Sequence, residues 1–293
     1  MVDYLKSMQK NNTDFIDYNM YNPFLLKGME DALYRIVKAI NEREKIVLYG
    51  FYDVDSITAI SLLMLVLKFL NADVEYFIPS QRSESRDIIE SDITSHIKYL
   101  GPALIITLGC GINSFSEIEL CKYMGINVII ADFHVPIKRH PDTIVVNPKQ
   151  KGCNYPFKGL SASGVAFKIA QAISSYYKMK SINKYLDLVM LGTISSKTKL
   201  ESENRIFAQE GIKQLKNTNN YGICALLKTH NIVVINEDTV SKLALTVMPT
   251  INAVGRMDNA KIVVELFITS DRNRALQISK YLDKELKNSL MNR

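Results

Sequence analysis

Acidic side chains follow a short apolar run near the start of the chain, where acids often hold a metal ion. Asp53 and Asp55 stand one residue apart in the stretch FYDVDS, directly after the apolar residues 46–50. Carboxylate oxygens are the hard ligands that Mg²⁺ and Mn²⁺ prefer in proteins. The spacing raises the question of whether this is a working metal site or what remains of one.

Two further loops carry residues of chemical interest. Gly109-Cys110-Gly111 follows the apolar run 103–108, and Asp132-Phe133-His134 follows the run 127–131. If these runs are parallel strands, their carboxyl ends lie along one edge of a sheet, which is where ligands bind in such folds. We therefore expect the three loops to meet at that edge.

The elements that position these loops can be predicted from the hydrophobic pattern. Continuous apolar strands joined by helices are typical of a parallel sheet covered on both faces. Past residue 160 the pattern becomes helical, and the last stretch is a charged amphipathic helix. The predicted fold class is α/β: a parallel β-sheet flanked by helices, followed by a helical portion and a C-terminal connector helix. The expected strands are 46–50, 73–78, 103–108, 127–131 and 143–146, and the expected helices are 28–43, 56–71, 86–98, 114–124, 161–177, 182–195, 203–216, 239–247, 259–268 and 271–293.

Composition limits the class of protein. The chain has 293 residues, of which 47% are hydrophobic and 23% charged, so it can bury a core and is not disordered. It has no apolar run of the roughly 18 residues that a membrane helix needs, and its first residues lack a signal-peptide core. We expect a cytoplasmic protein with no membrane partner.

The net charge of +6 permits a polyanionic partner without requiring one. Four scattered cysteines without C-x-x-C spacing argue against a zinc ribbon or a disulfide framework.

The motifs, in this order, resemble the DHH phosphoesterase superfamily, and within it most closely the RecJ single-strand-specific exonucleases. YDVDSITA resembles the first metal motif, LIITLGCGINSFSEIELCKYMGINVIIADFHVP the second and third, YLDLVMLGTISS the fourth, and PTINAVGRMDNAKIVVELFITSD the substrate-side signature. The resemblance runs from about residue 22 to residue 271. It implies an N-terminal arm over 1–21, a DHH domain over 22–258 and a helical connector over 259–293, with the family's second domain absent from this sequence.

The resemblance implies a site with a pair of divalent cations, usually manganese or magnesium, held by carboxylates and histidine. Such a pair can activate a water and neutralise the phosphodiester oxygens. The sequence departs from the family at four expected ligand positions, which hold Phe51, Gly109, Phe133 and Ser196. The family residues that remain are Asp53, Asp55, Asp132 and His134. We therefore predict no catalytic site and no cofactor, with Asp53 and Asp55 as the remaining candidate for a single metal, and we interpret FYDVDS as a remnant.

Several residues are candidates for contact with phosphate or nucleic acid. Arg256 matches the family's Gly-Arg, although the neighbouring family arginine is Thr250 here. Ser163 and Gly164 open a helix whose N–H groups can receive an anion, and a tight helix–sheet contact is the alternative. His134 is either a phosphate contact or a histidine held by loop hydrogen bonds. Arg82, with Arg86, follows the second strand, where the family has substrate-facing residues.

Lysines near the fourth motif suggest how the acids could be neutralised. Asp53 and Asp55 without metals would repel each other and favour proton uptake. Lys197 could restore neutrality by pairing with them, and the alternative is that Lys197 and Lys199 point into solvent. Lys149 and Lys151 are predicted to belong to a solvated loop.

Three functions remain open at this point. The leading hypothesis is a catalytically inactive RecJ-like DHH protein with a binding or scaffold role linked to DNA replication or repair, whose partner is single-stranded DNA or a protein of that machinery. One alternative is an active single-strand-specific DNA exonuclease with an altered metal site that uses Mn²⁺ or Mg²⁺. The other is a single-stranded nucleic-acid-binding module, for which affinity should fall with salt. The sequence does not predict the oligomeric state.

Overall fold

The computed structural model describes residues 20–79, 87–137, 140–180, 182–248 and 259–291. The predictions for Arg82, Arg86, Thr250 and Arg256 lie outside these residues, as does almost all of the expected N-terminal arm. Within the described part of the chain, no helix is long and apolar enough to cross a membrane.

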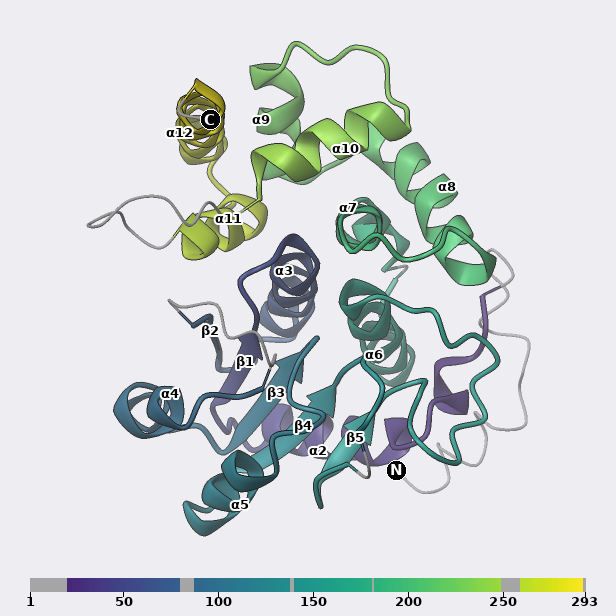
Figure 1. The fold of residues 1–293 in the computed structure, drawn as a ribbon, viewed down its shortest axis with the longest axis vertical. Coiled ribbons are helices and arrows are strands. Elements are labelled where there is room, and N and C mark those ends of the chain that lie inside the picture. The colour runs from purple at the N-terminus through teal and green to yellow at the C-terminus, as the bar shows by residue number, and fades with distance from the viewer. Residues whose placement is uncertain (1–19, 80–86, 138–139, 181, 249–258, 292–293) are drawn as a thin grey trace.

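A five-stranded parallel sheet forms the centre of the N-terminal half, with strand order β2-β1-β3-β4-β5 (Figure 1). Every neighbouring pair is parallel. Because each connection must return to the start of the next strand, helices lie between most of them and cover the sheet. The strands are β1 Ile46–Gly50, β2 Val74–Phe77, β3 Leu104–Leu108, β4 Asn127–Ala131 and β5 Ile144–Val146.

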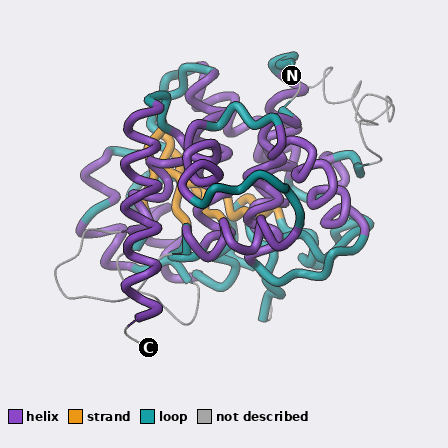
Figure 2. The backbone as a smooth tube through the Cα atoms, turned by 90° about the horizontal axis from the view of Figure 1, so that it is seen from above, coloured by secondary structure: helices purple, strands orange, loops and turns teal. Residues whose placement is uncertain are grey.

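Both faces of the sheet are buried, which explains why its strands are apolar without alternation. Ile46 and Leu48 of β1 belong to the larger core cluster, together with residues of α2, α3 and α6. Val47 and Tyr49 point to the opposite face, where the second cluster includes residues of α4 and α5. Figure 2 shows the strands enclosed among helices.

The helices continue from the sheet into a second, entirely helical half. Figure 1 shows α8 to α12 gathered beyond α3 and α7. The α-helices are α2 Met29–Asn41, α3 Val54–Phe69, α4 Glu90–Ser95, α5 Phe115–Tyr123, α6 Ala162–Tyr176, α7 Leu186–Ser195, α8 Ser202–Lys216, α9 Tyr221–Thr229, α10 Glu237–Thr246, α11 Asn259–Ile268 and α12 Arg272–Met291. Short 3₁₀ helices cover Pro23–Leu25, Ile97–Leu100 and Asn183–Tyr185.

Helix α3 joins the two halves. It packs against β1 and β2 on one side and against α6, α7 and α11 on the other. Nearly all of its residues are buried, so it is apolar around its whole circumference. Its start carries Asp53 and Asp55, so the acids of FYDVDS lie where the sheet meets the helical half.

The predicted fold class is confirmed, and the differences in its elements have local causes. The predicted helix 86–98 is shorter, because α4 ends at Ser95 and a 3₁₀ turn begins after His96, whose φ of −132° is not helical. Helix α9 was not predicted. Its signal was Asn220, whose side chain caps the helix by accepting the N–H of Ile223 at 3.1 Å.

Candidate functional site

A cleft of about 480 Å³ lies at the carboxyl edge of the sheet, and we call it the sheet-edge cleft. It brings together the residues that follow β1, the residues that follow β4 and the end of α7. The lining residues are Asp53, Val54, Asp55, Phe133, His134, Ser195, Ser196, Lys197 and Met248. Two of the three loops predicted to meet therefore line one cleft, whereas the Gly109 loop packs against it without contributing to the lining.

Asp53 begins helix α3. Its extended backbone, with φ −141° and ψ 162°, places the carboxylate over the first turn, where Oδ1 accepts the N–H of Ser56 at 2.8 Å. An aspartate at this position satisfies one of the helix's open donors. This role requires no metal, because the backbone of α3 itself supplies the positive end of a dipole.

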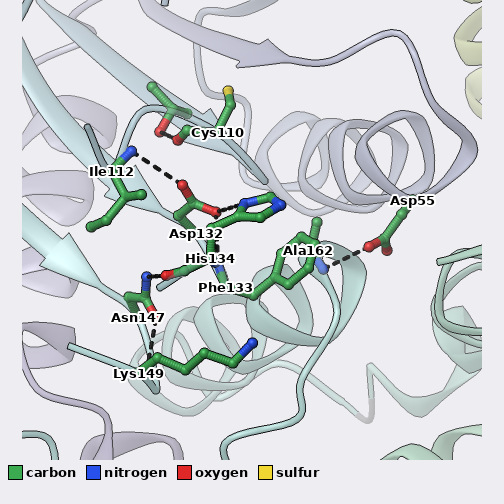
Figure 3. A network of polar contacts seen from close by, with 10 residues as sticks. Asp55, Cys110, Ile112, Asp132, Phe133, His134, Asn147, Lys149 and Ala162 are labelled. Carbon is green, nitrogen blue, oxygen red and sulfur yellow. Dashed lines mark hydrogen bonds and ion pairs between the residues drawn. The ribbon is translucent and has the colours of Figure 1, made fainter. Parts of the chain in front are cut away.

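Asp55 is bound by another helix. Its side chain is buried, and its Oδ2 accepts the N–H of Ala162 at 2.8 Å (Figure 3). Its Oδ1 accepts the N–H of Ser163 at 2.9 Å. Burial, and next the charge of Asp53, raise the pKa of Asp55 to about 6, although the hydrogen bonds from Ser163 and Ala162 oppose that shift. The carboxylate therefore sits on the N-terminus of α6 as an internal anion.

The N-terminus of α6 is already satisfied by protein groups. Ser163 is fully buried, its N–H is used by Asp55, and the N–H of Gly164 donates to Ser161 Oγ at 3.1 Å. The contact joins two helices, α3 and α6, and is not the helix–sheet contact that the sequence left as the alternative to phosphate binding. An external anion could reach the N–H groups of Ser163 and Gly164 only by displacing Asp55 and Ser161.

Asp132 holds two loops together. Its Oδ2 accepts the N–H of Ile112 at 3.1 Å, and its Oδ1 accepts the N–H groups of Phe133 at 2.7 Å and His134 at 3.2 Å (Figure 3). Only 1% of Asp132 is exposed. Both oxygens are thus committed to the backbone that follows β3 and β4.

His134 faces the cleft with one nitrogen already engaged. Its Nδ1 lies 2.7 Å from Asp132 Oδ1. An ionised carboxylate can only accept, so Nδ1 carries the hydrogen and Nε2 of the neutral ring has a lone pair. His134 would therefore have to be protonated before Nε2 could donate to a phosphate. The contact that holds the loop is present without any ligand.

The four replaced ligand positions are filled by ordinary packing. Phe51 is buried in the core cluster that includes Tyr49. The Phe133 ring lies beside the His134 ring, with centroids 4.1 Å apart. Ser196 Oγ donates to the carbonyl of Thr193 at 2.8 Å.

Gly109 has no room for a ligand side chain. Its φ of 76° lies in the left-handed region that favours glycine. A Cβ built there would lie 2.8 Å from Ala162 Cβ and 3.0 Å from Ser56 Oγ. A carboxylate at position 109 would require α6 or α3 to move.

The residues present do not fit a two-metal centre. Among the described residues, no group of three or more histidine, cysteine, aspartate or glutamate side chains is arranged to hold a metal ion. Asp55 and Asp132 each use both carboxylate oxygens for backbone N–H groups. Ligation by either acid would leave buried donors without an acceptor.

Lys197 lines the cleft without an ion pair to the acids, and solvent exposure was the alternative that the sequence left open. Its side chain is exposed, and within the described part of the chain no ion pair joins it to Asp53 or Asp55. Lys199 is exposed as well. The physical reason is that Asp55 faces the N–H groups of α6, which supply its compensation without a lysine.

Residues after β5 also support the cleft. Asn147 is buried and its Nδ2 donates to the carbonyl of His134 at 2.9 Å. Lys149, predicted to lie in a solvated loop, is half-buried with its Nζ 5.8 Å from the centroid of the Phe133 ring. Asn147 was not predicted, because its only signal in IVVNPKQ is that of a polar residue directly after an apolar strand.

Comparisons with known proteins identify the relatives of this chain. The model of the DHH family, N-terminal domain, matches residues 45–193. The single-stranded-DNA-specific exonuclease RecJ of Bacillus subtilis is 38% identical over 271 residues, which cover 92% of this chain and 34% of that protein. RecJ of Haemophilus influenzae is 32% identical over 278 residues, covering 91% of this chain and 48% of that protein. The chain thus spans about a third to a half of these relatives.

A solved structure shows the same fold. The crystal structure of exonuclease RecJ bound to manganese superposes with a TM-score of 0.82 at 25% identity, covering 91% of this chain and 67% of that one. The manganese belongs to that protein. In the present chain, the sheet-edge cleft is lined by the residues named at the start of this subsection.

Proposed function

This chain belongs to the DHH family, and we propose that it is a RecJ-like member without nuclease chemistry that keeps a binding role in DNA replication or repair. The observation that carries the proposal is the state of the four replaced positions. Phe51, Phe133 and Gly109 have no side-chain oxygen or nitrogen to offer, and the Ser196 hydroxyl is bonded to its own helix. The loss of a single supporting group near a metal can lower affinity or activity about 10–100-fold.

The remaining acids support the same proposal because they have structural duties. Asp53 caps α3, Asp55 binds the start of α6, and Asp132 braces the loops after β3 and β4. Each contact would persist in a protein that never binds metal. Folding alone is therefore a sufficient reason for their presence.

A nuclease assay tests this proposal. The chain is incubated with a 5′-phosphorylated single-stranded oligonucleotide and Mn²⁺ or Mg²⁺, beside the variant Asp53→Asn, which keeps a helix-capping oxygen. We expect the two proteins to release nucleotides at the same background rate, and calorimetry to detect no tight Mn²⁺ site. Metal-dependent release that Asp53→Asn abolishes would instead establish the active exonuclease.

A single-stranded nucleic-acid-binding role is the second candidate, and Lys197 favours it. This lysine is an exposed cation in the sheet-edge cleft with no ion pair among the described residues. Relatives are named as single-stranded-DNA-specific. If the cleft receives a strand, its affinity for single-stranded DNA should fall steeply with salt, and Lys197→Ala should reduce the slope by about one. Binding that is absent, or insensitive to Lys197→Ala, would leave only the protein-scaffold form of the proposal.

A further inference from the structure

A second cavity, of about 440 Å³, lies between α9 and α12 in the helical half, and we call it the α9–α12 cavity. It shares no lining residue with the sheet-edge cleft. Its volume is within the range of small-molecule sites. The lining residues are Thr218, Asn219, Tyr221, Cys224, Ala225, Lys228, Arg272, Asn273 and Leu276.

The charged residues of this cavity are all cations. Lys228 and Arg272 line it, no aspartate or glutamate does, and neither cation forms a salt bridge within the part of the chain that the structure describes. Cys224 is an exposed residue whose thiol adds no negative charge at neutral pH, because partial desolvation, as the largest cause, raises the pKa of the thiol. The cavity therefore presents positive charge to whatever enters it.

The two neighbouring carboxylates are occupied elsewhere. Asp187 is buried behind Thr218, whose hydroxyl donates to it at 2.6 Å, and it also accepts the N–H of Leu188 at 2.8 Å. Asp271 caps α12 by accepting the N–H of Asn273 at 2.8 Å. Both acids thus have partners other than the two cations of the cavity.

Arg272 is held in place by an aromatic ring. Its guanidinium carbon lies 4.9 Å from the centroid of the Tyr221 ring. Among the described residues no hydrogen bond uses the N–H donors of this guanidinium, so its fork is left for a ligand. Asn219 and Asn273 add exposed amides, and Ala225 and Leu276 supply an apolar wall.

We propose that the α9–α12 cavity binds a small phosphorylated ligand with an apolar part. The phosphate lies between Arg272 and Lys228, since a guanidinium fork and an ammonium suit phosphate oxygens. The rest of the ligand packs against the wall of Ala225 and Leu276 and reaches the asparagine amides. This proposal is independent of the function proposed for the sheet-edge cleft.

Calorimetric titration of the full 293-residue chain with a nucleoside monophosphate, and separately with inorganic phosphate, tests the proposal. Arg272→Ala and Lys228→Ala should each weaken nucleotide binding at least about tenfold, because each removes a charged contact. Arg272→Lys keeps the charge without the fork and should give an intermediate loss. The matched control is Lys280→Ala, an exposed cation on α12 outside the cavity. It should bind like the parent protein.

Three results would overturn the proposal: no saturable binding by the parent chain, an equal loss in Lys280→Ala, or a nucleotide that binds no more tightly than inorganic phosphate. The last would indicate a general attraction for anions rather than a ligand site. Far-UV circular dichroism and thermal melting of each variant separate lost binding from lost folding. Because Arg272→Lys is a small change, its result remains interpretable if an alanine variant unfolds.

Discussion

The chain contains two cavities of similar volume, about 480 and 440 Å³, which use their polar side chains in opposite ways. In the sheet-edge cleft, the acids Asp53 and Asp55 are bonded to backbone N–H groups of the protein itself. In the α9–α12 cavity, Lys228 and Arg272 have no ion pair among the described residues. The comparison shows that acids of a family motif can be employed in folding, while unpaired cations in the described part of the chain also lie where no motif points.

Each cavity has a buried aspartate, in its lining or behind it, whose pKa is raised to about 6, chiefly by burial. Asp55 receives its hydrogen bonds from another helix, 107 and 108 residues along the chain. Asp187 receives them from its own helix and from the Thr218 hydroxyl. Asp55 therefore joins distant parts of the fold, whereas Asp187 makes a more local contact.

The largest expected effect is at Asp55. Asp55→Ala leaves the buried N–H groups of Ala162 and Ser163 without an acceptor, and should lower the free energy of unfolding by about 2–4 kcal/mol. Asp53→Ala removes only a helix cap and should lower it by about 1 kcal/mol. Urea denaturation at neutral pH measures both. Equal losses in the two variants would contradict the role given to the Asp55 contact.

Asp187 should make the stability of the protein depend on pH. Since its pKa is about 6 in the folded protein and near 3.8 in the unfolded chain, the folded state holds the proton to higher pH, and stability falls as pH rises from about 4 to 6. A difference of about two pH units corresponds to about 3 kcal/mol. Asp187→Asn should remove this loss, so the variant should gain up to about 3 kcal/mol over the parent between about pH 4 and pH 7.

Urea denaturation across that pH range measures the difference. Asp55 titrates in the same window, but it is present in both proteins, so its contribution cancels. A difference between variant and parent that does not change with pH would contradict the prediction. Thr218 can still bond to the asparagine, because its hydroxyl can accept as well as donate.

The smallest expected effect is a difference in the free energy of unfolding between two glycine variants. It tests how closely the residues beside the sheet-edge cleft pack. Gly109→Ala should lower the free energy of unfolding by about 1–2 kcal/mol for its left-handed backbone, and further for the contact at Ala162. Gly125→Ala is the matched control, because its φ is 73° and nothing lies within 4 Å of an added Cβ. The control isolates the backbone part, so the difference between the variants, about 1 kcal/mol or more, measures how tightly the space around position 109 is closed.

Equal losses of unfolding free energy in Gly109→Ala and Gly125→Ala would mean that α6 shifts easily to make room for the added methyl group. In that case a carboxylate at position 109 could be accommodated, and Gly109→Asp would become a fair attempt to restore a metal ligand. Denaturation curves of the two alanine variants under one set of conditions decide between these outcomes.

Much of the fold could be predicted because its signals are local. The strands at 46–50 and 127–131 agree with the structure to the residue, since a short continuous apolar run between turn residues is typical of a buried parallel strand. Helix α9 was missed because only Asn220 marks its start and the helix is short. The meeting of Asp53 and His134 in one cleft followed from the rule that loops gather at the carboxyl edge of a parallel sheet.

The sequence by itself determined the parallel sheet, the absence of side-chain ligands at Phe51, Gly109 and Phe133, and the family to which the chain belongs. Only the tertiary structure decided what neutralises Asp55. Lys197 was the candidate cation near the fourth motif, but the hydrogen-bond partners of Asp55 are N–H groups of α6, which every sequence carries and no pattern marks. The α9–α12 cavity likewise depends on packing between helices that begin at residues 221 and 272. Hydrophobic periodicity is a local property, whereas the pairing of backbone donors with distant carboxylates is fixed only when the helices pack.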